Sequence, residues 1–220
     1  GHTGTTLLSG IFHISGFKSL QVDNHFESKP LVALNKKLLQ NGGEIIYQEF
    51  KSYFKLLEDK TKSVWCIKDP RLSLTIHNIY PLIPKPVKII YNFRDPRTTV
   101  NHLLKERKNQ NPAIEQTKAL IGAENEYYER NKSILDFIHS HPEIESLIIN
   151  YDDLVDGKLQ DILDRFVGKR MNYAFVQPNK RKSSPIEVSS DLMEIFNEIT
   201  SIYEDNLSHC IRNTSAIGCG

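Results

Sequence analysis

The chain has 220 residues, of which 39% are hydrophobic and 25% are charged, and its formal net charge is +1. These values are typical of a folded domain with one substantial core, and they exclude a strongly basic protein that binds nucleic acid or acidic membranes through its overall charge. No apolar run approaches the roughly 18 residues of a membrane span, so we expect a single domain over residues 1–220 with no membrane span and no nucleic-acid partner.

The predicted elements alternate between helices and strands. A glycine-rich turn opens the chain and leads into an apolar helix at residues 6–14. Two further helices are expected at residues 31–40 and 44–59, and the second carries apolar side chains on one face, at Ile45, Ile46, Phe50, Tyr53, Phe54 and Leu57. Short runs rich in β-branched and aromatic residues predict three buried strands, at residues 64–68, 87–93 and 146–151. More helices are expected at residues 72–79, 98–108, 113–140, 159–167 and 189–211.

Strands that alternate with helices favour an α/β fold, here a P-loop-like three-layer sandwich around a central parallel sheet. Two polar segments, residues 105–112 and 177–185, are predicted to be flexible. The cysteines Cys66, Cys210 and Cys219 have no metal-binding or redox spacing, and Cys66 lies in an apolar run typical of a core residue. We therefore expect a cytoplasmic protein that binds no metal.

The opening turn has the composition of an anion-binding loop. Gly4 allows close backbone approach, Thr5 and Thr6 supply hydroxyl groups, and the start of the following helix adds positive potential. A P-loop of the kinase type would carry lysine where Thr5 stands, which disfavours a kinase or an ATPase. A helix cap that binds no ligand is the alternative interpretation of this turn.

A phosphate-binding loop normally follows a strand, and none stands ahead of Gly1. We therefore expect that the chain is truncated at its amino terminus and that the first strand of the sheet is missing from it. An upstream extension is expected to make the protein more stable and more active.

Three further motifs follow the predicted strands: Lys68-Asp-Pro-Arg71, Phe93-Arg-Asp-Pro-Arg97 and Ile149-Asn-Tyr-Asp-Asp-Leu154. Together with His2-Thr-Gly-Thr-Thr6, they resemble the sulfotransferases that use 3′-phosphoadenosine 5′-phosphosulfate (PAPS), particularly the bacterial and tyrosylprotein-type branches. The resemblance spans residues 1–185. It implies PAPS as the donor, no metal, and an acceptor with a hydroxyl or amine. The acceptor could be a glycan, a lipid-linked sugar, a small metabolite or a peptide tyrosine, and a glycan is preferred from the bacterial branch alone.

The resemblance also implies which residues bind the donor. The opening turn (His2, Thr3, Gly4, Thr5 and Thr6) would hold the 5′-phosphosulfate, Arg94 and His102 the 3′-phosphate, Tyr151 the nucleotide, and Arg181 a loop that closes over it. Two residues depart from the family pattern, because it has lysine or arginine at position 2 and serine at position 102. Protonation beside two anionic groups would let His2 replace the missing cation.

Arg94 also has an interpretation of its own. A guanidinium at the carboxyl edge of a parallel strand lies in the crevice where α/β sheets bind ligands, and it can grip a phosphate with two hydrogen bonds. The alternative is an ion pair at the strand end, with Asp95 or Asp69. For His102 the alternative is a histidine on a helix surface, with Asn101 as a rival donor, and for Arg181 it is a solvated basic patch. Arg97 and Asp153 are expected to be structural.

Sulfuryl transfer to a hydroxyl requires a base for the departing proton and positive charge near the sulfonyl oxygens. By resemblance to the tyrosylprotein-type branch, Glu27 is the expected base; His25 is the alternative base and a candidate substrate contact. Lys68 and His2 are the expected catalytic cations, and Asp69 and Arg71 are expected to order the acceptor. In the alternative interpretation Glu27 only caps the next helix, while Lys68, Asp69 and Arg71 belong to an internal salt-bridge cluster.

Two other functions stay open at this stage. A nucleoside-type kinase would share the strand–loop–helix arrangement but would require Mg²⁺ and ATP. A nucleotide-binding module without catalysis would bind the desulfated nucleotide and transfer no sulfate.

Overall fold

The computed structural model describes residues 4–41, 44–61, 64–174, 176 and 184–215. Its elements, in chain order, are α1 (Thr5–Ile14), α2 (Lys29–Asn41), α3 (Glu44–Thr61), α4 (Leu72–Ile79), the 3₁₀ helix η1 (Tyr80–Leu82), β1 (Ile89–Phe93), α5 (Pro96–Gln110), α6 (Gln116–Ser140), β2 (Ser146–Asn150), α7 (Tyr151–Val155), α8 (Gln160–Val167) and α9 (Ser190–Ser215). The chain is thus a mixed α/β protein in which helices predominate.

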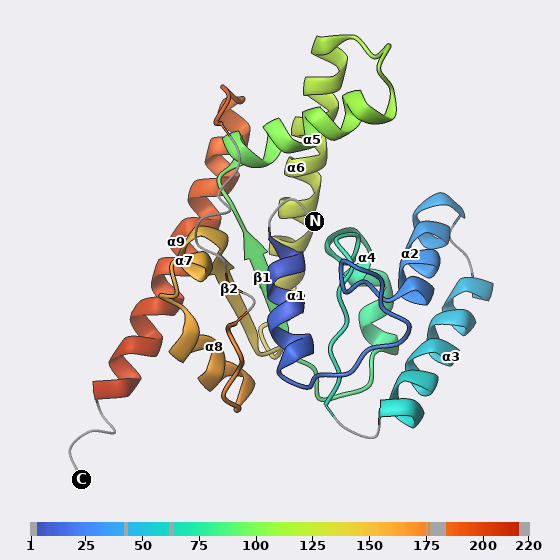
Figure 1. Ribbon diagram of the computed structural model, residues 1–220, viewed down its shortest axis with the longest axis vertical. Helices are drawn as coiled ribbons and strands as arrows, with labels where there is room; N and C mark the ends of the chain where they lie inside the picture. Colours follow the sequence, from blue (N-terminus) through green and yellow to red (C-terminus); the bar gives the residue numbers. More distant parts are fainter. Residues whose placement is uncertain (1–3, 42–43, 62–63, 175, 177–183, 216–220) are drawn as a thin grey trace.

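Strands β1 and β2 form a parallel two-stranded sheet, in a register that pairs Ile89 with Ser146 and Phe93 with Asn150. Their apolar centres explain this pairing, because Phe93 and the run Leu147–Ile149 are buried. Helices α5 and α6 connect the two strands, and α9 packs along β2, while α2 and α3 lie at the opposite side of the molecule (Figure 1). The strands predicted at residues 87–93 and 146–151 are confirmed, and a three-layer arrangement stays a prediction.

The strand predicted at residues 64–68 is wrong in the described part of the chain. Residues 64–68 form no strand, and their sheet-like contact is an isolated parallel bridge between Trp65 and Lys18. Lys18 donates its N–H to the carbonyl of Val64 and accepts a hydrogen bond from the N–H of Cys66 at 2.9 Å. The pattern identified an extended segment that is only partly buried, with Val64 exposed. A strand requires a continuous partner, and β1 is not that partner.

The flexible segment predicted at residues 105–112 is also wrong, because α5 continues to Gln110. Its last turns pack against α6, where Arg107 Nη2 lies 2.9 Å from Glu126 Oε2. The polar composition of this segment reflects a solvated helix with an ion pair rather than a loop. The other predicted loop, residues 177–185, lies mostly outside the described residues.

The core has two parts that meet at α6. One lies around the sheet and contains the apolar side of α1, with Ile11 and Phe12, together with Phe93 and Ile148. The other lies between α2, α3 and α4, and the predicted apolar face of α3 is buried there, at Ile46, Phe50, Tyr53, Phe54 and Leu57. No helix in the described part of the chain is long and apolar enough to cross a membrane.

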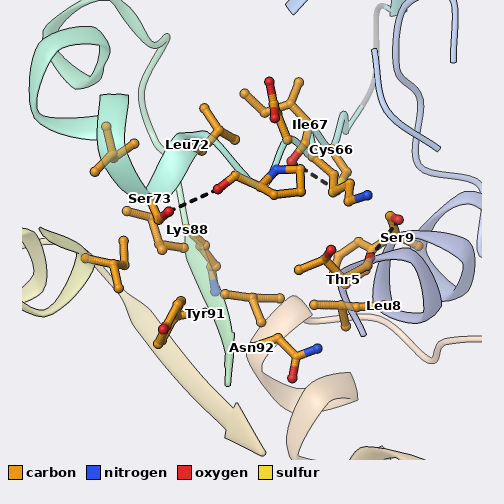
Figure 2. Close-up of a pocket in the computed structure, with 18 of the residues that line it drawn as sticks. Thr5, Leu8, Ser9, Cys66, Ile67, Leu72, Ser73, Lys88, Tyr91 and Asn92 are labelled. Atoms are coloured by element: carbon orange, nitrogen blue, oxygen red, sulfur yellow. Dashed lines mark hydrogen bonds between the residues drawn. The ribbon is translucent and has the colours of Figure 1, made fainter. Parts of the chain in front are cut away.

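An apolar cavity of about 680 Å³ separates β1 from the extended segment at residues 64–68. Figure 2 shows Thr5, Leu8 and Ser9 of α1 on one side of it, with Cys66 and Ile67 on another and Tyr91 and Asn92 of β1 facing them. The Cys66 thiol borders this cavity deep in the protein, where burial raises its pKa to about 12. The Asn92 side-chain oxygen is buried beside this cavity. The edge of β1 that faces the cavity has no neighbouring strand in the described sheet.

A strand added at this edge is expected to stabilise the protein. Five residues of strand in a sheet occupy roughly 17 × 4.8 × 10 Å, or about 800 Å³, close to the volume of the cavity. Five apolar, β-branched residues fused before Gly1 are therefore expected to raise the melting temperature by several degrees, measured by calorimetry. A glycine–serine extension of the same length is the control, and equal melting temperatures would contradict the expectation.

Candidate active site

Gly4 precedes helix α1 as its cap residue, and its φ of 81° lies in the left-handed region that favours glycine. A Cβ at this position would lie 1.9 Å from Cδ2 of Tyr151, so the absence of a side chain lets the tyrosine ring pack directly against the turn. The hydroxyl of Thr5 is buried and has no hydrogen-bond partner among the described residues. The other predicted members of the turn, His2 and Thr3, lie outside the described residues.

Lys68 joins three parts of the candidate site. Its ammonium group lies 2.5 Å from Glu27 Oε1, 3.4 Å from the carbonyl oxygen of His25 and 3.5 Å from the hydroxyl of Thr6. The Lys68 and Glu27 side chains are only 9% and 15% exposed, so the ion pair is largely shielded from water. The structure therefore brings the start of α1, the predicted base and the predicted catalytic lysine together.

The segment that carries Glu27 is a tight turn organised by Asp23. Oδ1 of Asp23 accepts hydrogen bonds from the N–H groups of His25, at 2.7 Å, and of Glu27, at 3.0 Å. Phe26 has a φ of 58°, a conformation that is uncommon for a bulky residue, and its N–H donates to the carbonyl of Asp23. The side chain of His25 is exposed. Asp23 was not recognised from the sequence, although a carboxylate that starts a turn in this way is a recognisable signal.

The charge of Asp23 contributes to this turn. Burial alone would raise the pKa of Asp23, but the hydrogen bonds from Glu27 and His25 outweigh it and lower the pKa below its usual value. Because the folded-state pKa is depressed, the stabilisation is present above the unfolded pKa and is lost as the pH falls through the folded value.

An Asp23→Ala variant is expected to lose roughly tenfold or more in turnover, with little change in global stability. The reason is that Glu27 loses the bond that positions its backbone, while no residue from Asp23 to Glu27 belongs to either part of the buried core. Asp23→Asn is the matched control, because its side-chain oxygen still accepts both hydrogen bonds and its turnover is expected to stay close to that of the parent chain. Equal losses in the two variants would argue against a positioning role; the measurements are kcat and melting temperature.

The carboxylate of Asp69 is fully engaged inside the protein. Its Oδ1 accepts from the N–H and the Nη1 of Arg71, at 3.0 and 2.9 Å, and its Oδ2 accepts from Nδ2 of Asn35 at 2.9 Å. Thr75 completes the network by donating to Oδ1 of Asn35. These contacts favour an internal ion-pair cluster, in which Asp69 orients the Arg71 guanidinium. Neither Asn35 nor Thr75 was recognised from the sequence, since each looks like an ordinary helix residue.

Arg94 lies on the ring of Tyr151. Its guanidinium carbon is 4.5 Å from the ring centroid, and Nη2 is 3.8 Å from Oδ1 of Asp152. The side chain is 14% exposed, and its Nε is buried without a hydrogen-bond partner among the described residues. Tyr127 donates its hydroxyl to the Arg94 carbonyl at 3.0 Å, which fixes the end of β1. The Tyr151 ring therefore contacts both the turn at Gly4 and the guanidinium of Arg94.

Arg97 and Asp153 have the structural roles expected for them. Arg97 donates from its side chain and its backbone N–H to the carboxylate of Asp95, which caps α5. Asp153 accepts from the hydroxyl of Tyr203 at 2.7 Å and pairs with Lys158 at 2.6 Å. Asp95 is thus paired with Arg97, and Asp69 with Arg71. The ion pair that the structure describes for Arg94 is with Asp152, and not with Asp95 or Asp69 as in the alternative interpretation.

His102 lies on α5 with an exposed side chain, whereas its neighbour Asn101 is buried and donates to the carbonyl of Ser184 at 2.6 Å. The N–H of Ile186 bonds to the carbonyl of Arg97, so the segment that follows residue 183 lies against the start of α5. Arg181 itself lies outside the described residues. The predicted phosphate-binding roles of His102 and Arg181 stay predictions.

We compared the chain with known proteins. No protein-family model matches the sequence, and no curated protein matches it. A solved structure, the sulfotransferase domain from the curacin biosynthetic pathway, superposes with a TM-score of 0.60 at 15% sequence identity, over 90% of this chain and 94% of that one. The chain has a sulfotransferase fold.

Within this sulfotransferase fold, no cluster of three or more histidine, cysteine or acidic side chains in the described residues is arranged to hold a metal ion. The candidate site consists instead of a helix start, a lysine–glutamate ion pair and an arginine stacked on a tyrosine.

The contact between Gly4 and Tyr151 gives a test of the site that needs no acceptor. A Gly4→Ala variant is expected to weaken binding of adenosine 3′,5′-bisphosphate at least tenfold, because the new Cβ would displace the Tyr151 ring. Gly168→Ala is the matched control: Gly168 has a φ of 74° but nothing within 4 Å of a new Cβ, so this variant carries the backbone strain without the collision. Titration calorimetry should find the affinity of the control unchanged, and equal affinities for the two variants would contradict the role of the contact.

Proposed function

We propose that this protein is a sulfotransferase that moves the sulfuryl group of PAPS to a hydroxyl or amine of an acceptor, such as a glycan or a small metabolite. The observation that supports this best is Lys68, which links the hydroxyl of Thr6 at the start of α1 to the carboxylate of Glu27. That linkage lies in a chain with a sulfotransferase fold.

The described residues fit an anionic nucleotide at two places. The N-terminal end of α1 presents backbone N–H groups, with the buried hydroxyl of Thr5 beside them, and Arg94 offers a guanidinium whose Nε has no partner among the described residues. Buried polar atoms without partners are rare and require an explanation, which a bound anion would supply. In the proposal the turn at His2, Thr3, Gly4, Thr5 and Thr6 holds the phosphosulfate end, and Arg94, His102, Tyr151 and Arg181 hold the nucleotide end.

PAPS supplies the activated sulfuryl group when it is bound. Glu27 accepts the proton of the acceptor hydroxyl, and the turn at Asp23 holds Glu27 in place. Lys68 supplies positive charge between Glu27 and the start of α1, in a site that is largely shielded from water, where such charge acts strongly. His2 is proposed as a second cation there, and Arg71, held by Asp69, together with His25, as an acceptor contact.

The proposal is tested by incubating the chain with ³⁵S-labelled PAPS and a panel of sugars, phenols, amines and aliphatic alcohols. We expect label in at least one acceptor, formed without added Mg²⁺ and lost in a Lys68→Ala variant. Label that stays in PAPS across the whole panel, although the nucleotide binds, would favour a nucleotide-binding module. Activity that depends on ATP and Mg²⁺ would favour a kinase.

A further inference from the structure

A second cavity, of about 370 Å³, lies beside Glu27 between the start of α4 and the facing sides of α5 and α6. Its volume is within the range of small-ligand sites, about 300–1,000 Å³. Charged side chains dominate its lining: Glu27, Arg71, Glu106, Arg107, Glu126 and Arg130. Among the described residues that line it, only Pro70 and Leu103 are apolar, and none is aromatic.

Part of the lining of this cavity is built around Glu126, which lies on α6. Its two carboxylate oxygens hold two guanidinium groups, with Arg107 Nη2 at 2.9 Å from Oε2 and Arg130 Nη2 at 2.6 Å from Oε1. Gly122 leaves room for this arrangement, because a Cβ there would lie 2.8 Å from Nη1 of Arg107. Each guanidinium has five N–H donors, so donors remain after the described bond to Glu126.

The lining of the cavity carries both negative and positive side chains. Glu27 is paired with Lys68 and Arg71 with Asp69, while Glu126 is shared by Arg107 and Arg130. Carboxylates only accept hydrogen bonds and guanidiniums only donate them. A ligand that satisfies both must offer several groups that donate and accept at once, and the hydroxyls of a sugar ring do so.

A phenol or a long-chain alcohol fits this cavity poorly. Each has a single hydroxyl and an apolar body, which would displace water from the charged side chains without replacing its hydrogen bonds. Sites built to hydrogen-bond a polar ligand reject analogues that lack the polar groups by large factors. The larger cavity beside β1 also reaches Lys68, and its lining is mainly apolar, unlike that of the polar cavity.

We infer that the polar cavity is the acceptor site and that the acceptor is polyhydroxylated, a mono- or oligosaccharide. This inference rests on the proposed sulfuryl transfer. One sugar hydroxyl faces Glu27, and the other hydroxyls lie among Arg107, Glu126 and Arg130. The acceptor oxygen forms a bond to sulfur as the bond between sulfur and the phosphate oxygen of the donor breaks; Glu27 takes the hydroxyl proton, and adenosine 3′,5′-bisphosphate leaves.

The test compares a panel of neutral, amino and acidic disaccharides with 4-nitrophenol and 1-octanol as acceptors of labelled sulfate. We expect transfer to at least one disaccharide. Arg107→Ala is expected to raise the KM for that sugar at least tenfold, which corresponds to a loss of about 1.4 kcal/mol in binding free energy. The affinity for adenosine 3′,5′-bisphosphate is expected to stay within about twofold of the parent value. Gly122→Ala, which displaces Arg107 without removing its charge, is expected to raise KM in the same direction.

Arg165→Ala is the matched control, because Arg165 is exposed on α8, where it donates to a carbonyl of its own helix, and it is expected to leave KM unchanged. Transfer to the phenol or octanol and to no sugar would overturn the inference and leave the proposed function intact. Bisphosphate binding with no transfer to any acceptor would overturn both, in favour of a nucleotide-binding module. If a sugar is accepted but Arg107→Ala behaves like Arg165→Ala, the cavity is not the acceptor site. Failure to bind the bisphosphate would remove the proposed function and the inference together.

Discussion

A Glu27→Gln variant is expected to lose about a hundredfold to ten-thousandfold in turnover, the range that general-base catalysis contributes. It is also expected to be less stable by about 3 kcal/mol, because removing one partner of a buried ion pair leaves the other charge uncompensated, here that of Lys68. Turnover is measured with saturating PAPS, and stability by denaturant unfolding.

The two effects are separated by a double variant, Glu27→Gln with Lys68→Met. When both charges are removed, no buried charge is left without a partner. The free energy of unfolding is therefore expected to return most of the way to that of the parent chain. Turnover is expected to stay low, because neither the base nor the cation is restored. Recovery of turnover along with stability would show that the ion pair is only structural and would remove Glu27 as the base.

An Arg94→Ala variant is expected to bind adenosine 3′,5′-bisphosphate roughly a hundredfold more weakly. The lost hydrogen bonds to a phosphate are charge-assisted, and about 3 kcal/mol corresponds to that factor. Arg94→Lys is expected to recover only part of the affinity, because an ammonium group does not reproduce the planar pair of donors or the stacking on Tyr151. The measurement is the dissociation constant from calorimetry.

Arg97→Ala is the matched control for Arg94. Arg97 lies three residues away on the same motif, but its guanidinium is exposed and paired with Asp95 at the start of α5. We expect its affinity for the bisphosphate to be within about threefold of the parent value, as for other exposed ion pairs. An equal loss for the two arginines would contradict a specific role for Arg94.

Much of the fold could be predicted from patterns that are local in the sequence. The amphipathic face of α3 and the apolar runs that became β1 and β2 are examples, since burial of one face or of a whole run leaves a direct signature. Residues 64–68 show the limit of this signature. An apolar extended run records burial, but whether it becomes a strand depends on a partner that is distant in the sequence.

The short helix α7 was not predicted, because only five residues are helical and its signal is a single cap. Asn150 accepts a hydrogen bond from the N–H of Asp152 at 2.8 Å, and this bond turns the chain sharply at the end of β2. The turn places Tyr151 between Gly4 and Arg94. The sequence motif marked Tyr151 as a site residue, but not the contact that makes it one.

The candidate site was partly visible in the sequence. Motifs that follow apolar runs in the sequence indicated Lys68 and Arg94, whereas Tyr151 was indicated by the resemblance to sulfotransferases. Residues that position other members of the site were not recognised. Asp23 forms a local turn with Glu27, four residues later, and that turn signal was overlooked. Asn35 acts on Asp69 through a contact that forms only when distant segments fold together. The polar cavity between α5 and α6 was missed for the same reason, since Arg107, Glu126 and Arg130 look like ordinary charges on solvated helices.

The central claim is that the start of α1 and Arg94 bind the two ends of one adenosine bisphosphate, and calorimetric titration tests it most directly. We expect adenosine 3′,5′-bisphosphate to bind with a one-to-one stoichiometry and ATP to bind much more weakly, with or without Mg²⁺. Binding of ATP that matches or exceeds that of the bisphosphate, or no heat from either, would contradict the claim.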